Sequence, residues 1–499
     1  MNEGNRSQIS AAVLDEWEVY CYSDSLSERG LRDRFARHGL TPGKCHNRLI
    51  HYIFFDDIFR NERVTEGIFQ CLLEYFPDAI THFDEDGLSP FYFACLGACS
   101  SKNTTLSFIQ LIVDAAPDSV RSVNSEGCTP LHYLCENDQV DEPNALEILN
   151  LLLDKYLEAA SHADDCGCLP IHYACKWRSS EFCQVLIKTA PDSVRSVDIG
   201  GWTTLHYFCC YRSDMDDTAA MQVLILLIEI YPEAVRHVNN EGKLPLHYAC
   251  SRGCLATVEY MYDIYPDAII HATTRGHYPI HLAIASVKCR ENPAIAAEIV
   301  PFLLNCDPNQ KLIQLRGRSL LRYACQIMRY GSNIETAIQV IGCLFDAHPE
   351  AIEDDEFAAD TNRYHPHVQS FINNELVYAR QANDHRLMMT PDDNGQLPLH
   401  TALQNNVRLG SIKLLVNGNP SAVRAVDRQG NTALHYACRR AKHDMIALLL
   451  AKSFVSRRNA HDKLPIHLLW ESKVSDRESI EYTESIFRLL RADPEMINQ

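Results

Sequence analysis

The sequence predicts an all-α solenoid of about eleven helix–loop–helix repeats joined by hairpin-like turns. First, an octet recurs along the chain, as in "KLPLHYAC" at 243–250 and "NTALHYAC" at 431–438. Second, a glycine stands five residues before the histidine of most octets. Third, a longer apolar pattern with helical spacing follows each octet. One unit that recurs over most of a chain predicts stacked repeats rather than separate globular domains.

The glycine predicts a tight turn at the start of each repeat. It occurs in nine repeats, and such a constant place is typical of a backbone position with positive φ. The histidine of the octet serves as a marker, and nine of its eleven equivalents are His, with Tyr92 and Arg322 as the exceptions. The marker positions are 51, 92, 132, 172, 206, 247, 281, 322, 400, 435 and 467.

A short first helix is expected around each marker. Proline stands two residues before the marker in seven repeats, where its fixed φ and missing N–H suit the first turn of a helix. A second helix is expected further along, for example in "NALEILNLLLDKY" at 144–156 and "NIETAIQVIGCLFDAH" at 333–348. Pro-Asp or Pro-Glu follows most second helices, and from Pro77, Pro117, Pro191, Pro232 and Pro266 the next turn glycine is ten residues away. This constant step predicts that the second helix of each repeat is connected to the next turn in one fixed way.

These motifs resemble the ankyrin repeat, whose period is about 33 residues and whose hallmark is T-P-L-H-x-A. Thr129, Pro130, Leu131 and His132 match that hallmark, and related octets recur over roughly 44–499. The resemblance implies an ankyrin solenoid that binds another protein. It also implies that the marker histidines hydrogen-bond backbone and hydroxyl groups at the turn, and that the cysteine three residues later is a small side chain facing the neighbouring repeat.

Four segments are expected. Residues 1–43 form an N-terminal helical cap, with helices in "AAVLDEWEVY" and "LSERGLRDRFARHG", and residues 44–352 form a first array of repeats. Residues 353–394 lack a clear motif and form either an insertion or a degenerate repeat. Residues 395–499 form the C-terminal repeats.

The composition argues against several functions. The net charge of −19 disfavours contact with nucleic acid, because phosphate binding needs a positive surface. The most apolar run, "MQVLILLIEIY" at 221–231, is too short to span a membrane and contains Glu229. The N-terminus lacks a signal pattern, so we expect a monomeric protein of the cytoplasm or nucleus, with its twenty cysteines reduced.

Two sets of residues favour an alternative, catalytic or metal-dependent function. His172 and Cys175 share a helix face, with Cys166 and Cys168 just before them, and zinc could bind such a group. His365 and His367 have metal-ligand spacing within 353–394, so an enzymatic activity could belong to that segment or to the N-terminus. A periodic motif does not by itself converge on one ion, and no phosphate-binding glycine loop or catalytic motif is present. We therefore expect no catalytic residue, no metal and no cofactor.

The expected function is a scaffold or adaptor that binds a partner protein through the concave face of the array. Basic and aromatic residues recur just after the first helices of three consecutive repeats. Repeats place equivalent residues side by side, so these residues are expected to form one patch. On an acidic protein such a patch favours an acidic segment of the partner. The patch comprises Trp177, Arg178, Tyr211, Arg212 and Arg252.

Overall fold

The computed structural model divides the chain into two compact units, residues 1–275 and 276–499. Helices make up almost all of the regular structure in both units. The all-α fold class predicted from the sequence is therefore confirmed. The residues that the structure describes are 20, 23, 25–39, 41–42, 64–81, 88–95, 104–136, 140–211, 216–288, 293–307, 309, 313–315, 317–328, 333–353, 364–405, 407–453, 455–472 and 479–494.

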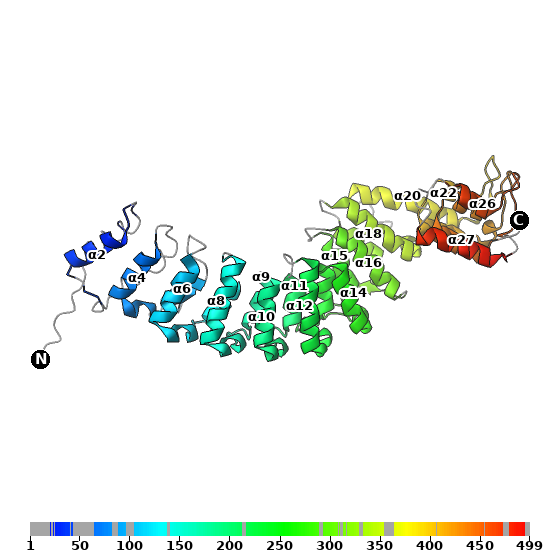
Figure 1. Cartoon of the computed structure of the whole chain (residues 1–499). Helices are drawn as coiled ribbons and strands as arrows, with labels where there is room; N and C mark the ends of the chain where they lie inside the picture. The colour runs from blue at the N-terminus through cyan, green and yellow to red at the C-terminus, as the bar shows by residue number, and fades with distance from the viewer. Residues whose placement is uncertain are drawn as a thin grey trace. The chain divides into compact units, whose positions relative to one another are not determined.

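In the first unit short first helices alternate with mostly longer second helices (Figure 1). The first helices are α5 (Pro90–Cys95), α7 (Pro130–Glu136), α9 (Pro170–Trp177), α11 (Thr204–Tyr211) and α13 (Pro245–Arg252). The second helices are α4 (Glu66–Tyr75), α6 (Thr104–Ala115), α8 (Glu142–Lys155), α10 (Ser180–Thr189), α12 (Asp217–Ile230) and α14 (Leu255–Ile264). Each first helix packs against the next first helix, as α9 does against α11. The second helices pack in a parallel layer, as α10 does against α12.

An N-terminal helix covers the start of this stack. Helix α2 (Glu28–Arg37) packs on α4, burying Leu31 and Phe35, and the Phe35 ring stacks on Tyr75 with ring centres 4.2 Å apart. The helix predicted in "LSERGLRDRFARHG" is thereby confirmed. The predicted helix at 11–20, except for Tyr20, and the first octet around position 51 lie outside the described residues.

The second unit repeats the two-layer pattern. Its first helices are α15 (Pro279–Ser286), α17 (Leu320–Ile327), α22 (Pro398–Gln404), α24 (Ala433–Arg439) and α26 (Pro465–Glu471). Its second helices are α16 (Ala294–Cys306), α18 (Ile334–Ala347), α23 (Leu409–Gly418), α25 (His443–Leu450) and α27 (Ile480–Ala492). A two-stranded antiparallel hairpin, β1 (Gln314–Leu315) and β2 (Arg318–Ser319), leads into α17.

The turn glycines adopt the predicted conformation. Eight of the nine have φ between 70° and 79°, and the ninth, at position 87, is not described. Single backbone hydrogen bonds connect successive turns, for example from the Ile199 N–H to the Cys166 oxygen and from the Asn240 N–H to the Gly200 oxygen. The turns thus form a continuous edge within each run of repeats, where a side chain at glycine would be strained.

An aspartate or asparagine closes seven of the described turns, a feature that was not identified from the sequence. The Asp164 Oδ1 accepts hydrogen bonds from the N–H groups of Cys166 and Cys168, each at 2.8 Å. The other carboxylate oxygen accepts a 2.7 Å hydrogen bond from the Tyr173 hydroxyl, which ties the turn to the first helix. The signal in the sequence is an Asx residue eight positions before the marker. These residues are Asn124, Asp164, Asp198, Asn239, Asp392, Asp427 and Asn459.

The last turn lacks its glycine, and Asp462 takes the same place with φ of 60°. A non-glycine residue in this region costs about 1 kcal/mol. We expect Asp462→Gly to raise the free energy of unfolding by about 1 kcal/mol, because the ion pair with Arg458 that it removes is exposed and weak. Urea denaturation measures the change. Asp462→Ala is the matched control and should not raise the free energy of unfolding, since it removes the carboxylate but keeps the strained backbone. Equal stability of the Gly and Ala variants would contradict this account.

The predicted fixed connection after the second helix is also confirmed. Five-residue 3-10 helices begin at the prolines of the Pro-Asp and Pro-Glu pairs, where the missing proline N–H would have no partner. In the first unit they are η1 (Pro77–Thr81), η2 (Pro117–Arg121), η4 (Pro191–Arg195), η5 (Pro232–Arg236) and η6 (Pro266–Ile270), with η3 (Leu157–Ser161) at the same place without proline. In the second unit η8 (Pro349–Glu353) follows the same rule, and η10 (Pro420–Val423) is one residue shorter.

The described part of the segment 353–394 contains two helices, α20 (Pro366–Asn383) and α21 (His385–Met389). Helix α20 packs against α18 and α23, which also contact each other directly. Its buried Glu375 accepts a hydrogen bond from Ser411 of α23. The segment is thus built into the second-helix side of its unit, and the division between compact units falls at Gly276.

The cysteines that follow the markers lie in the core. All seven are almost completely buried, and burial raises the pKa of the thiols of Cys135, Cys325 and Cys438. Small buried thiols fit this closely packed core, as where the Cys209 Sγ lies 3.8 Å from the Met261 Sδ of α14 in the next repeat. The seven are Cys95, Cys135, Cys175, Cys209, Cys250, Cys325 and Cys438. In the described parts of the chain, we find no helix whose length and apolar character would let it cross a bilayer.

Candidate partner-binding surface

Three neighbouring first helices of the first unit place the predicted site residues. Helix α11 packs between α9 and α13 (Figure 1). Trp177 ends α9, Tyr211 ends α11 and Arg252 ends α13, each five residues after its marker histidine. The repeat therefore brings these three side chains to equivalent places at the ends of adjacent helices.

The marker histidines fix the start of these helices. The Nδ1 atom of His206 accepts hydrogen bonds from the Thr203 N–H at 3.1 Å and from the Thr203 hydroxyl at 2.8 Å. Its Nε2 therefore carries the proton and donates to the Lys243 carbonyl of the next repeat at 3.1 Å. One side chain thus caps its own helix and holds the neighbouring turn. The predicted structural role of these histidines is confirmed, since the same backbone hydrogen bond to Nδ1 occurs at His132, His172, His247, His281, His400, His435 and His467.

Tyr92 replaces the histidine in one repeat and keeps the connection to the next. Its buried hydroxyl donates a 2.9 Å hydrogen bond to the Cys128 carbonyl. That carbonyl follows a turn glycine, as does the Cys168 carbonyl contacted by His132. The longer phenol side chain therefore reaches the same acceptor, which explains why this marker tolerates Tyr.

Four aromatic rings form a cluster across α11 and α13. Trp202 lies in the turn before α11, and its ring centre is 4.6 Å from Tyr248, 5.2 Å from Tyr207 and 6.4 Å from Tyr211. Tyr207 and Tyr211 are stacked, with ring centres 6.3 Å apart. The Tyr207 hydroxyl donates a hydrogen bond to Asp198, and the Asn239 amide donates one to the Tyr248 hydroxyl. Rings fixed by their neighbours present a rigid apolar surface.

Positive charges border this cluster. The Lys176 ammonium lies 4.6 Å from the Trp177 ring centre and 4.9 Å from that of Tyr211, so it bridges two repeats by cation–π contacts. Arg252 is exposed. Burial raises the pKa of Tyr211, and the nearby Arg252 charge acts in the opposite direction. We call the surface formed by Lys176, Trp177, Trp202, Tyr211 and Arg252 the aromatic–basic strip.

The prediction that Arg178 belongs to this exposed surface is wrong. Its side chain is only 1% exposed. The guanidinium donates to the Leu134 carbonyl at 2.6 and 3.0 Å and to the Val140 carbonyl at 3.0 Å, closing the loop of the preceding repeat. The physical reason is the end of α9 at Trp177: Arg178 has extended backbone angles, φ −113° and ψ 162°, and is no longer on the helix face of its neighbours.

The other predicted residues have different outcomes. Arg212 lies outside the described residues. Trp177, Tyr211 and Arg252 occupy equivalent helix ends as expected, and partner binding by them remains a prediction. Trp202 was not identified from the sequence, although its place directly after the turn glycine Gly201 is a recurrent one. Lys176, directly before Trp177 in the chain, was not among the predicted site residues either.

The candidate metal ligands have other partners. The Cys168 thiol lies 3.3 Å from the Tyr207 hydroxyl, whereas Cys175 is fully buried and neighbours Cys183. The His365 Nδ1 caps α20 by accepting a hydrogen bond from the His367 N–H. Within the described ranges no group of three His, Cys, Asp or Glu side chains is placed to hold a metal ion.

A family comparison agrees with the repeat geometry. The model for ankyrin repeats in three copies matches residues 96–195 and 357–459. The chain is an ankyrin repeat protein. The second matched range includes most of 353–394, the segment without a clear motif. Ankyrin repeats generally mediate protein–protein interactions and are typically non-enzymatic binding modules.

Two solved structures are similar to parts of this ankyrin repeat protein. One is a chain of the predatory endopeptidase Bd0816 from Bdellovibrio bacteriovorus in complex with immunity protein Bd3460, at 15% identity and a TM-score of 0.32, covering 43% of this chain and 97% of that one. The other is the ankyrin repeat domain of Bcl-3, a member of the IkappaB family, at 20% identity and a TM-score of 0.33, covering 48% of this chain and 94% of that one. No curated protein matches the chain.

Proposed function

We propose that this protein is a non-enzymatic scaffold or adaptor that binds another protein through the aromatic–basic strip. The observation that carries the proposal is the position of Trp177. This residue is 42% exposed at the end of α9, beside Lys176 and Tyr211. A tryptophan that is held in place but left half uncovered is a typical anchor for a partner.

The chemistry of the strip supports a partner segment that is both acidic and apolar. Lys176 and Arg252 place positive charge beside the aromatic rings, on a protein with a net charge of −19. An acidic segment would be attracted locally, and its apolar side chains would cover the rings of Trp177 and Tyr211. Glu241, a carboxylate of the turn edge, already pairs with Lys243 at 2.6 Å.

The test compares partner capture by three full-length proteins. We expect Trp177→Ala with Tyr211→Ala to reduce recovery of the partner at least about tenfold, because anchor aromatics contribute about 2 kcal/mol or more each. Quantitative mass spectrometry of captured proteins measures the recovery. The control is Phe487→Ala, which removes an exposed aromatic ring from α27 in the other unit and should not change recovery.

A second arm tests the charge. Replacing Lys176 and Arg252 with glutamate should weaken the same complex, and added salt should weaken the wild-type complex. Arg178 is unsuitable for this purpose because it is buried. The proposal fails if the aromatic double variant captures the same proteins as the wild type, with equal recovery.

A further inference from the structure

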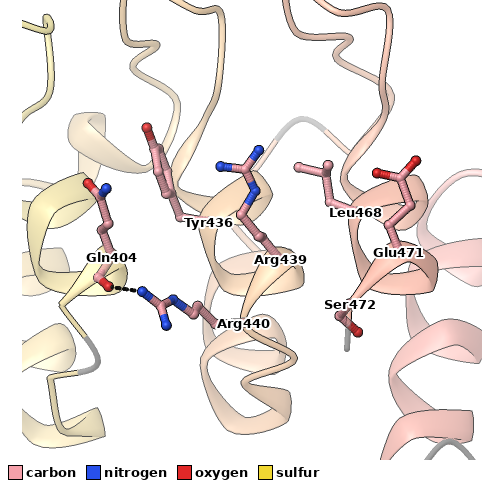
Figure 2. A pocket seen from close by; sticks show the side chains of 7 residues that line it. All are labelled: Gln404, Tyr436, Arg439, Arg440, Leu468, Glu471 and Ser472. Atoms are coloured by element: carbon pink, nitrogen blue, oxygen red, sulfur yellow. Dashed lines mark hydrogen bonds between the residues drawn. The ribbon is translucent and has the colours of Figure 1, made fainter. Parts of the chain in front are cut away.

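A second surface, in the unit 276–499, has a different chemistry. An open pocket of about 390 Å³ lies across the ends of α22, α24 and α26. Figure 2 shows Arg439 standing between Tyr436 and Leu468, with Gln404 and Glu471 on either side. These residues follow their marker histidines by one or four positions, so the pocket is built from repeated places of three consecutive repeats.

The polar groups around Arg439 are already engaged. The Tyr436 hydroxyl donates to Asp427 and accepts from the Gln396 side chain at 2.8 Å. Both carboxylate oxygens of Glu471 bind the Lys463 ammonium, at 2.7 and 2.6 Å. The neighbouring Arg440 donates a 2.8 Å hydrogen bond to the Gln404 carbonyl. Among the described residues, by contrast, the Arg439 side chain makes no hydrogen bond or ion pair, and it is exposed.

This arrangement leaves a net positive charge in the pocket. Lys463 compensates Glu471, so the charges of Arg439 and Arg440 are not balanced by the pocket's own carboxylate. A guanidinium offers parallel N–H donors that match a planar carboxylate. The Tyr436 ring and Leu468 flank it with apolar surface.

We propose that this pocket binds a carboxylate of an acidic protein segment, with Arg439 as the anion-binding residue. An apolar group next to that carboxylate would lie against Leu468 and the Tyr436 ring. Arg440 adds positive charge, and its hydrogen bond to the Gln404 carbonyl fixes that side of the pocket. The site lies in the other unit from the aromatic–basic strip, so it goes beyond the proposed function and does not depend on it.

The experiment uses the full chain and a displayed library of short random peptides. Peptides selected on the wild type are sequenced, synthesised, and titrated against wild type and Arg439→Gln by fluorescence polarisation. We expect a class of peptides with Asp or Glu next to an apolar residue, bound at least about tenfold more weakly by the variant, as loss of a charge-assisted hydrogen bond implies. Arg439→Lys, which keeps the charge but not the parallel donors, should bind with intermediate affinity.

Controls separate this site from general electrostatics and from the strip. Arg428→Gln removes the same charge from an exposed arginine of the same unit outside the pocket and should bind these peptides like wild type. The Trp177→Ala and Tyr211→Ala variant should also bind them unchanged. Exchanging Glu for Gln in the peptide, or a free C-terminus for an amide, identifies which carboxylate occupies the pocket.

The proposal is overturned if the selection yields no peptide whose binding depends on Arg439, or if the Arg439-dependent peptides lack any carboxylate. A class of peptides that binds only when phosphorylated would likewise assign the pocket to phosphate and contradict it.

Discussion

Replacing Arg178 with methionine is expected to lower the free energy of unfolding by about 3–5 kcal/mol. The guanidinium satisfies the buried carbonyls of Leu134 and Val140 in the preceding repeat. Methionine fills much of the same space but donates no hydrogen bond, so both carbonyls would be buried without these donors. The Glu142 carboxylate, 3.7 Å from the Arg178 Nη1, would also lose its cation.

Urea denaturation followed by tryptophan fluorescence measures this change, because Trp177 and Trp202 lie in the same unit. Arg252→Met is the matched control, since this arginine is exposed, and should change stability by less than about 0.5 kcal/mol. A decrease in the free energy of unfolding of less than about 1 kcal/mol for Arg178→Met would show that the buried hydrogen bonds of Arg178 contribute little to stability.

Acid is the second condition expected to destabilise the protein strongly. Burial lowers the pKa of His132, His172 and His206 to about 4, although hydrogen bonds to the Cys168 and Lys243 carbonyls oppose the shift at His132 and His206. In the unfolded chain a histidine titrates near 6.5. The folded-state pKa is the lower one, so the stability that these residues contribute is complete above about pH 6.5 and is lost as the pH falls from there towards 4.

At pH 5 each of these histidines should lower the free energy of unfolding by about 2 kcal/mol relative to pH 7.5. Urea denaturation at both pH values tests this. His206→Gln should show a smaller loss between the two pH values than wild type, whereas His461→Gln, at an exposed turn position, should show the wild-type loss. Equal stability of the wild type at pH 7.5 and pH 5 would contradict the account.

Local rules explain why much of the repeat could be predicted. The turn needs a residue with positive φ, and glycine supplies it at little cost, so its spacing is visible in the sequence. The first helix needs a start signal, which proline and histidine provide two residues apart. The second helix shows its apolar face by periodicity. Each of these features depends on a few residues close in the chain.

The surface was harder to predict because it depends on contacts between repeats. Nothing in "KWRSS" shows that the helix ends at Trp177 and that Arg178 then reaches back to carbonyls near position 140. Trp202 joins Tyr248 only because successive turns and helices stack. The pocket around Arg439 likewise needs three helices in place, so the motif "RR" alone could not distinguish it from ordinary exposed charge.

The most direct test of binding through the aromatic–basic strip is site-specific photo-cross-linking in the complex with the captured partner. A cross-linking residue at Ser251 occupies in α13 the place that Lys176 has in α9 and leaves the strip intact. The same residue at Lys188, exposed on the second helix α10, is the control. We predict a covalent adduct with the partner from position 251 and none from position 188. An adduct from position 188 alone, or no adduct from position 251, would contradict the account.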